Sequence, residues 1–163
     1  MNNRLRLLVI LAALTLVSNG CGLFISSHHR TEDYTPVFAD ATAGNVAAVE
    51  AAIKIDPTVI KAKEWDGATL LHIAVGQNHK DLTEVLLNDG ADVNALTTDR
   101  LTPLHMAAKN GNIEIVTLLL DKKATINPID SKGWTPMDRA NKWQHPDAAE
   151  FLKQHGGHEG TQK

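Results

Sequence analysis

The sequence predicts an all-α fold, a solenoid of about four helix-turn-helix repeats. The first observation is a period of 33 residues, which separates the tetrads at 69–72 (TLLH), 102–105 (TPLH) and 135–138 (TPMD). The second is that apolar residues follow each tetrad at helical spacing, as Leu104 and Ala107 do. Two short helices cannot bury such faces alone, so the copies must stack on one another.

Residues 1–20 differ from the rest and are predicted to be a secretory signal peptide. Arg4 and Arg6 give a positive start, an apolar run follows from Leu7 to Val17, and small or polar residues come next. The apolar run is too short for a helix that spans a membrane. We therefore expect the protein to be exported.

Cys21 is the only cysteine, so it cannot form an intramolecular disulfide. An unpaired thiol is a liability in an oxidising compartment unless it is modified. Its position after the signal resembles the lipobox of bacterial lipoproteins, which implies lipidation at Cys21. Gly20 fits that pattern, whereas Ser18 and Asn19 depart from it, so plain cleavage nearby is the alternative. In such lipoproteins, an Asp directly after the cysteine retains the protein at the inner membrane. This chain has Gly22 there, so the resemblance favours the outer membrane, facing the periplasm.

The remaining chain divides into a tether, a repeat domain and a tail. Residues 21–34 hold the cysteine and a mostly polar segment without helical or strand periodicity. Residues 158–163 are predicted to be a frayed tail. The repeat domain covers 35–157, with units at about 35–63, 64–96, 97–129 and 130–157.

The first repeat is the least regular copy. Thr35 and Pro36 are predicted to cap a helix that continues through Ala43. In the helix that follows, Val49 and Ile53 have the spacing of a buried face. The repeat is one residue longer than the others.

The second and third repeats carry clear helix boundaries. Thr69 and Thr102 are good N-caps, and Gly111 is a good helix end. In the second helix of the third repeat, the predicted buried stripe is Ile113, Val116, Leu119 and Leu120.

The third repeat also departs from its neighbours in the hairpin. Arg100 stands where the other copies have Gly67 and Gly133. A non-glycine residue at positive φ costs energy, so this hairpin is expected to be distorted.

The fourth repeat is shortened, with a second helix over 147–154, and Trp143 is predicted to help close this end. Lys54 and Lys153 replace the apolar residue found at Leu87 and Leu120. A polar outer face on terminal repeats keeps a stacked array soluble, so we expect four units with both ends capped.

A period of 33 with a T-P-L-H-x-A opening resembles the ankyrin repeat, over roughly residues 35–157. The resemblance implies a β-turn hairpin and two helices in each unit. It also implies that the motif residues tie the turns together rather than carry chemistry. These structural motif residues are Thr69, His72, Thr102, Pro103, His105, Thr135 and Pro136.

No pattern in the chain points to catalysis, a metal or a cofactor. The net charge of −3 and a pI near 6.2 give no footprint for nucleic acid. Helices in neighbouring repeats pack about 8–10 Å apart, so His72 and His105 are too far apart to share a zinc ion. We expect no catalytic residue, no metal, no cofactor and no small-molecule substrate.

The resemblance implies that a partner protein meets the hairpin tips and the concave face of the first helices. Aromatic residues, Met and Arg are enriched at such interfaces. Trp65 is the strongest candidate because a tip offers it little to pack on, whereas Leu101 and Trp134 equally well pack on the next hairpin. The candidates, mapped by register, are Trp65, Asp66, Ile73, Thr98, Asp99, Leu101, Met106, Ser131, Lys132, Trp134 and Arg139.

These observations predict a non-catalytic lipoprotein of the bacterial cell envelope that scaffolds or inhibits a partner protein. The partner's identity and the oligomeric state stay open. One alternative is a metal-binding or catalytic envelope protein that uses its eight histidines. Another is a passive structural lipoprotein without a specific partner.

Overall fold

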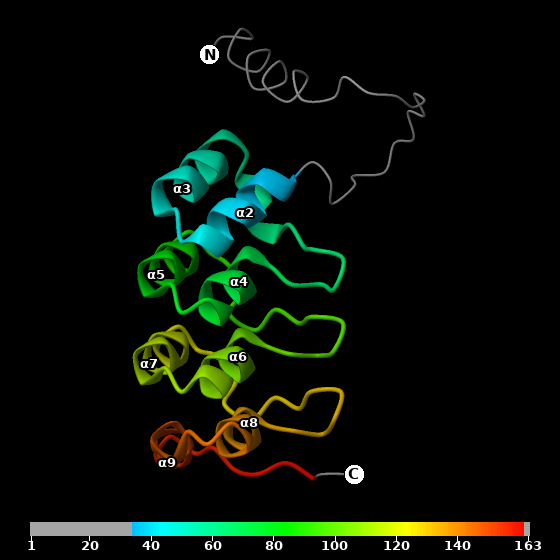
Figure 1. The fold of residues 1–163 in the computed structure, drawn as a ribbon, viewed down its shortest axis with the longest axis vertical. Helices are drawn as coiled ribbons and strands as arrows, with labels where there is room; N and C mark the ends of the chain where they lie inside the picture. The colour runs from blue at the N-terminus through cyan, green and yellow to red at the C-terminus, as the bar shows by residue number, and fades with distance from the viewer. Residues whose placement is uncertain (1–33, 162–163) are drawn as a thin grey trace, which may run out of the picture.

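The computed structural model describes residues 34–161, and in this part of the chain eight α-helices stack in pairs along one column (Figure 1). None of these helices is long and apolar enough to cross a membrane. Helices α2, α4, α6 and α8 form the layer beside the hairpins, and α3, α5, α7 and α9 form the second layer. The elements are α2 (Thr35–Ala43), α3 (Val46–Ile55), η2 (Pro57–Lys61), α4 (Leu70–Gly76), α5 (Lys80–Asn88), α6 (Pro103–Asn110), α7 (Ile113–Asp121), α8 (Pro136–Lys142) and α9 (Pro146–Gln154).

The signal peptide predicted for residues 1–20, Cys21 and the tether up to residue 33 lie outside the described residues. What the sequence indicates for them therefore stays a prediction.

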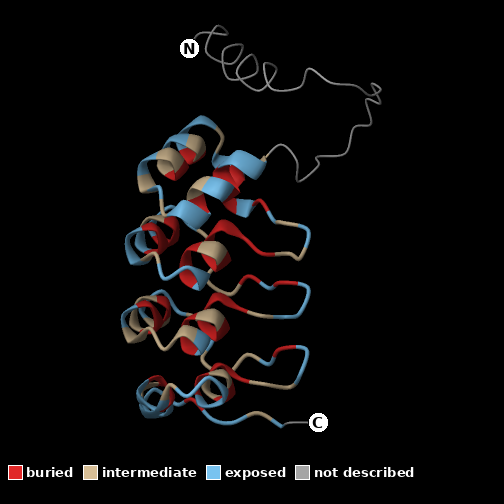
Figure 2. Ribbon diagram, viewed as in Figure 1, coloured by how far each residue is buried: buried red, intermediate tan, exposed pale blue. Residues whose placement is uncertain are grey.

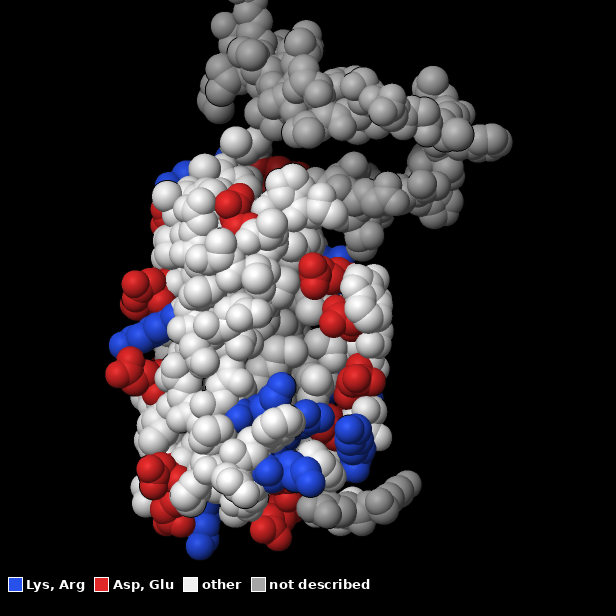
Figure 3. All heavy atoms as spheres, in the orientation of Figure 1, with Lys and Arg blue, Asp and Glu red and all other residues white. Residues whose placement is uncertain are grey.

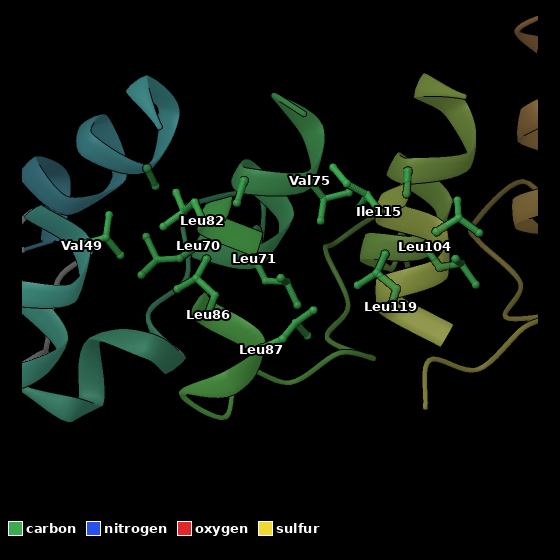
Figure 4. Packing of buried hydrophobic residues seen from close by; sticks show 14 of the residues in the cluster. Val49, Leu70, Leu71, Val75, Leu82, Leu86, Leu87, Leu104, Ile115 and Leu119 are labelled. Atoms are coloured by element: carbon green, nitrogen blue, oxygen red, sulfur yellow. The ribbon is translucent and has the colours of Figure 1, made fainter. Parts of the chain in front are cut away.

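The core lies between the two layers and between successive pairs (Figure 2). Figure 4 shows Val75 and Ile115 where the second and third repeats meet, and both are fully buried. Burying a side chain of this size stabilises the fold by about 1.5–3 kcal/mol. The stripe predicted for the third repeat was wrong at two positions, because Ile113 and Leu120 are only partly buried. Ile113 is the first residue of α7, and Ile115 is buried in its place.

Three of the inner helices start with the same reciprocal cap. The side chain of Thr69, Thr102 or Thr135 accepts a hydrogen bond from the backbone three residues later, and that later side chain bonds back to the threonine backbone. Threonine and its third neighbour therefore fix where α4, α6 and α8 begin.

The first repeat lacks this cap, which corrects the role predicted for Thr35. Helix α2 includes Thr35, and the N-cap position belongs to Tyr34, whose side chain makes no capping bond. The third position holds Phe38, and its ring has no atom that can accept a hydrogen bond from the threonine backbone. The connection after α3, which holds the extra residue of this repeat, forms η2, an element that the sequence did not predict.

Successive hairpins are joined edge to edge by backbone hydrogen bonds. Thr98 N–H donates to Asp66 O at 2.8 Å, and Ser131 N–H donates to Asp99 O at 2.9 Å. The hairpin tips are therefore held in register along one side of the column (Figure 1).

The distortion expected in the third hairpin is absent. Arg100 adopts φ 59°, close to the φ 81° of Gly67. Its N–H donates to Thr97 O at 2.9 Å, just as Gly67 N–H donates to Glu64 O at 2.9 Å. Arg100 thus accepts the strained backbone instead of altering the turn, and its side chain reaches Ile129 O at 3.4 Å.

Residues 158–161 are not the frayed tail that the sequence suggested. His158 O accepts a hydrogen bond from the Thr135 hydroxyl at 2.8 Å, and Gly160 N–H donates to Asp138 Oδ2 at 2.8 Å. Residues 158–161 thus bond to the start of α8. At α4 and α6, the equivalent place is taken by the hairpin of the following repeat. The last two residues lie outside the described part.

Both ends of the second layer carry an exposed lysine at the expected position. The side chains of Lys54 on α3 and Lys153 on α9 are 76% and 65% exposed. At the equivalent position of α5, Leu87 is buried. The outermost helices therefore do not present an apolar residue there.

Candidate functional site

A groove of about 360 Å³ lies between the hairpins and the inner helices α4 and α6. Its position follows from the local structure, because each hairpin projects away from the helix that it precedes (Figure 1). Five of the residues predicted to contact a partner meet here: Asp66, Ile73, Leu101, Met106 and Arg139.

The floor of the groove is apolar. Ile73 and Met106 occupy equivalent positions in α4 and α6, and both are partly buried against the core. They follow the capped start of each helix by four residues, so the same cap that fixes the helix also sets their direction.

The other candidates lie along the hairpins and not in this groove. Trp65 is 88% exposed at the second hairpin, as its tip position indicated. Thr98 and Asp99 are exposed on the third hairpin. The rest border a separate hollow at the fourth hairpin: Ser131, Lys132 and Trp134.

Trp134 is less available than Trp65. Its ring lies below two cations, with Lys132 Nζ 5.7 Å and Arg139 Cζ 5.5 Å from the ring centroid. The side chain is half-buried in this arrangement. Trp134 therefore serves the packing of the fourth repeat as well as its surface.

Arg139 is already paired with a buried carboxylate. Its Nε donates to Asp130 Oδ2 at 3.0 Å, and the Asp130 side chain is fully buried. Burial by itself would raise the pKa of Asp130, but hydrogen bonds from Arg139 and from the backbone N–H groups of Trp134 and Lys132 lower it overall. The positive charge of Arg139 is therefore compensated by Asp130, and the side chain contributes mainly to the shape of the groove.

His72 and His105 have both ring nitrogens engaged. In His72, Nδ1 accepts from Thr69 N–H at 3.2 Å, and Nε2 donates to Leu101 O at 3.0 Å. His105 repeats this arrangement, with Nε2 donating to Trp134 O at 3.0 Å. Because a carbonyl can only accept, the proton lies on Nε2 and the ring is neutral.

These bonds give the two histidines a structural role. Burial lowers the pKa of both His72 and His105, which favours that neutral form. Within residues 34–161, no group of three or more His, Cys, Asp or Glu side chains is placed to hold a metal ion.

The sequence did not single out Lys109 at the groove, and it indicated another role for Trp143. Lys109 lines the groove, and its Nζ lies 4.9 Å from the ring centroid of Trp143. Trp143 is 51% exposed, so its ring remains at the surface and does not close the end of the array as predicted. The available signal was that Lys109 and Lys142 are one period apart.

The comparisons with known proteins agree with this architecture. A family model described as ankyrin repeats (3 copies) matches residues 9–97 and 90–163. The serine/threonine-protein kinase VIK of Arabidopsis thaliana is 40% identical over 55 residues, which are 34% of this chain. The matched segment spans only 13% of the kinase, so this similarity is to one part of that protein.

Proposed function

Because the chain belongs to the ankyrin repeat family, we propose that it is a non-catalytic protein that binds a partner protein through its groove and hairpin tips. Ankyrin repeats generally bind other proteins, and the family is typically non-catalytic. The observation that carries the proposal is Trp65, 88% exposed beside a groove with an apolar floor. A large exposed aromatic next to a preformed groove is the usual composition of an interface hot spot.

The magnitudes are consistent with a specific contact. A tryptophan buries about 150–250 Å² at an interface, and hot-spot residues contribute about 2 kcal/mol or more. Ile73 and Met106 add apolar surface that is already in place, because α4 and α6 are packed on each other. Little ordering of the groove is then needed upon binding.

We further propose that the protein acts at the bacterial cell envelope. The positive start and apolar run of residues 1–20 support export, and Cys21 supports a lipid anchor in the outer membrane. The partner is then an envelope protein that is scaffolded or inhibited. Cys21→Ser tests the anchor: incorporation of a labelled fatty acid should be lost, and the protein should leave the membrane fraction. Retention of the label would contradict lipidation at this residue.

Partner binding is tested with a photo-crosslinking residue at position 65 of the full-length protein. We expect a discrete crosslinked partner, and we expect Met106→Asp to abolish the product. Ile55→Asp is the matched control, because Ile55 is 68% exposed and lies on α3, away from the groove. A product that survives Met106→Asp, or no product at all, would contradict binding through the groove.

A further inference from the structure

The charge of two rows of equivalent positions, which begin at the groove, changes along the array. Positions one period apart on the hairpin tips are occupied by Asp66, Asp99 and Lys132. Positions one period apart near the ends of the inner helices are occupied by Gly76, Lys109 and Lys142. Both rows of positions therefore become basic toward the fourth repeat. In Figure 3, basic atoms gather around α8, and acidic atoms lie along the hairpins nearer the N-terminal end.

Three of these cations carry uncompensated charge. Lys109, Lys132 and Lys142 take part in none of the ion pairs recorded within residues 34–161. Arg139, by contrast, is neutralised by Asp130. The contacts of Lys109 and Lys132 with tryptophan rings leave their positive charge available. These three lysines thus bring local positive charge to a chain whose net charge is −3.

Trp143 adds apolar surface at the same end. Its ring is half exposed, with Lys109 above it and Lys142 next to it in the chain. If a carboxylate of a ligand contacts Lys109 and Lys142, an apolar group next to that carboxylate in the ligand can therefore pack on the Trp143 ring. This combination suits a carboxylate side chain that is followed by an apolar one.

We propose that the surface of the fourth repeat beside the groove binds an acidic segment of the partner protein, with carboxylates at Lys109, Lys132 and Lys142 and an apolar side chain on Trp143. This inference rests on the proposed function. It specifies the charge of the partner segment and the orientation in which that segment lies along the array. The acidic part of the partner lies over the fourth repeat, and a neutral or basic part faces Asp66.

The same charge pattern argues against a nucleic acid or another uniform polyanion. A chain of phosphates along the groove would leave the lysines and meet Asp66 and Asp99, where like charges repel. A protein segment varies its charge along its length and avoids that repulsion. Charges at an interface rim chiefly set orientation and association rate, and they are screened beyond about 10 Å at 0.1 M salt.

The test uses the full-length protein and two labelled probe peptides. One repeats Gly-Glu-Glu-Leu, and the other has Lys in place of Glu. Kd is measured by fluorescence anisotropy at low salt. We expect the natural protein to prefer the Glu peptide by about tenfold or more. Lys109→Glu combined with Lys142→Glu should reverse that preference.

The control variant combines Lys54→Glu with Lys153→Glu, which changes the net charge equally on the second layer. It should alter the preference by less than about twofold, since these sites are far from the groove. Equal affinity of the natural protein for both peptides would overturn the proposal. So would equal losses in both double variants, or binding of heparin as tight as that of the Glu peptide.

Failure of this inference is distinguishable from failure of the proposed function. If position 65 still crosslinks a partner while the peptides are not discriminated, only the acidic chemistry is wrong. If no partner crosslinks, the binding function itself is wrong, whatever the peptides show.

Discussion

His72 and His105 show how a single protonation state supports each repeat. Adding a proton to Nδ1 would remove the acceptor for the threonine N–H and place a charge in the core. In the fourth repeat the same position is Asp138, whose Oδ2 accepts from Thr135 N–H at 2.8 Å. The motif thus requires an acceptor at this place, and histidine adds a donor that reaches the following hairpin.

The two histidines should make stability depend on pH. Their folded-state pKa values lie below the usual 6.5, so the unfolded chain takes up protons first as the pH falls. The free energy of unfolding should therefore be constant above about pH 6.5 with respect to these groups, and should decrease below it. Urea titrations from pH 7.5 to 5 measure this slope. His72→Gln with His105→Gln should flatten it, and an unchanged slope would contradict the assignment.

Trp65 and Trp134 should separate binding from stability. Trp65→Ala should change the free energy of unfolding by less than about 0.5 kcal/mol, because the side chain is 88% exposed. Trp134→Ala should cost about 1–2 kcal/mol, because its ring supports Lys132 and Arg139. Chemical denaturation of both variants measures these changes in the free energy of unfolding. Equal midpoints would show that Trp134 is as free as Trp65.

The turns between paired helices bring a glycine of one repeat against a histidine of the next. A Cβ on Gly111 would lie 2.5 Å from Cγ of His145, and one on Gly44 would lie 2.7 Å from Nδ1 of His79. His79 Nε2 also donates to Thr42 O at 2.9 Å. These contacts connect adjacent helix pairs at their turns, just as the backbone hydrogen bonds connect adjacent hairpins.

Gly111→Ala should therefore destabilise the protein more than Gly90→Ala. Both glycines have positive φ and incur a similar strain of about 1–2 kcal/mol, but nothing lies within 4 Å of a Cβ added at Gly90. The additional cost at Gly111 should be relieved by His145→Ala. Thermal or urea unfolding of the two single variants and the Gly111/His145 double variant measures it. Identical losses for both single variants would show that the imidazole moves aside freely.

For the whole molecule, stability depends on contacts between neighbouring units. Helices α6 and α7 pack on α8 and α9, and the Nε2 proton of His105 is accepted by Trp134 O in the fourth repeat. Each repeat in such an array contacts only its neighbours, so the loss of one unit exposes one interface.

Deletion of residues 130–163 should accordingly lower the urea midpoint and also the m-value, since less surface is exposed on unfolding. A variant that keeps residue 130 onward but carries Lys153→Ala serves as the control, because Lys153 is exposed on α9. An unchanged midpoint after the deletion would contradict a stacked array.

The regular parts of the fold were predictable because they depend on local sequence. Thr102, Pro103 and His105 lie within one turn of each other, so cap and helix start are written in four consecutive residues. The irregular parts, η2 and the segment 158–161, were not predictable from the sequence, since they depend on packing against other elements. For the groove, register placed Ile73 and Met106 on one floor, but it gave no sign that Arg139 is already paired.

The sequence by itself determined the period, the caps at Thr69, Thr102 and Thr135 and most of the buried positions, since these follow from spacing along the chain. Only the tertiary structure decided which groove residues are free. Trp65 and Trp143 remain exposed, whereas Trp134 lies under two cations and Arg139 faces a buried carboxylate. The physical reason is that exposure and charge compensation depend on neighbours from other helices and hairpins, which spacing along the chain does not specify.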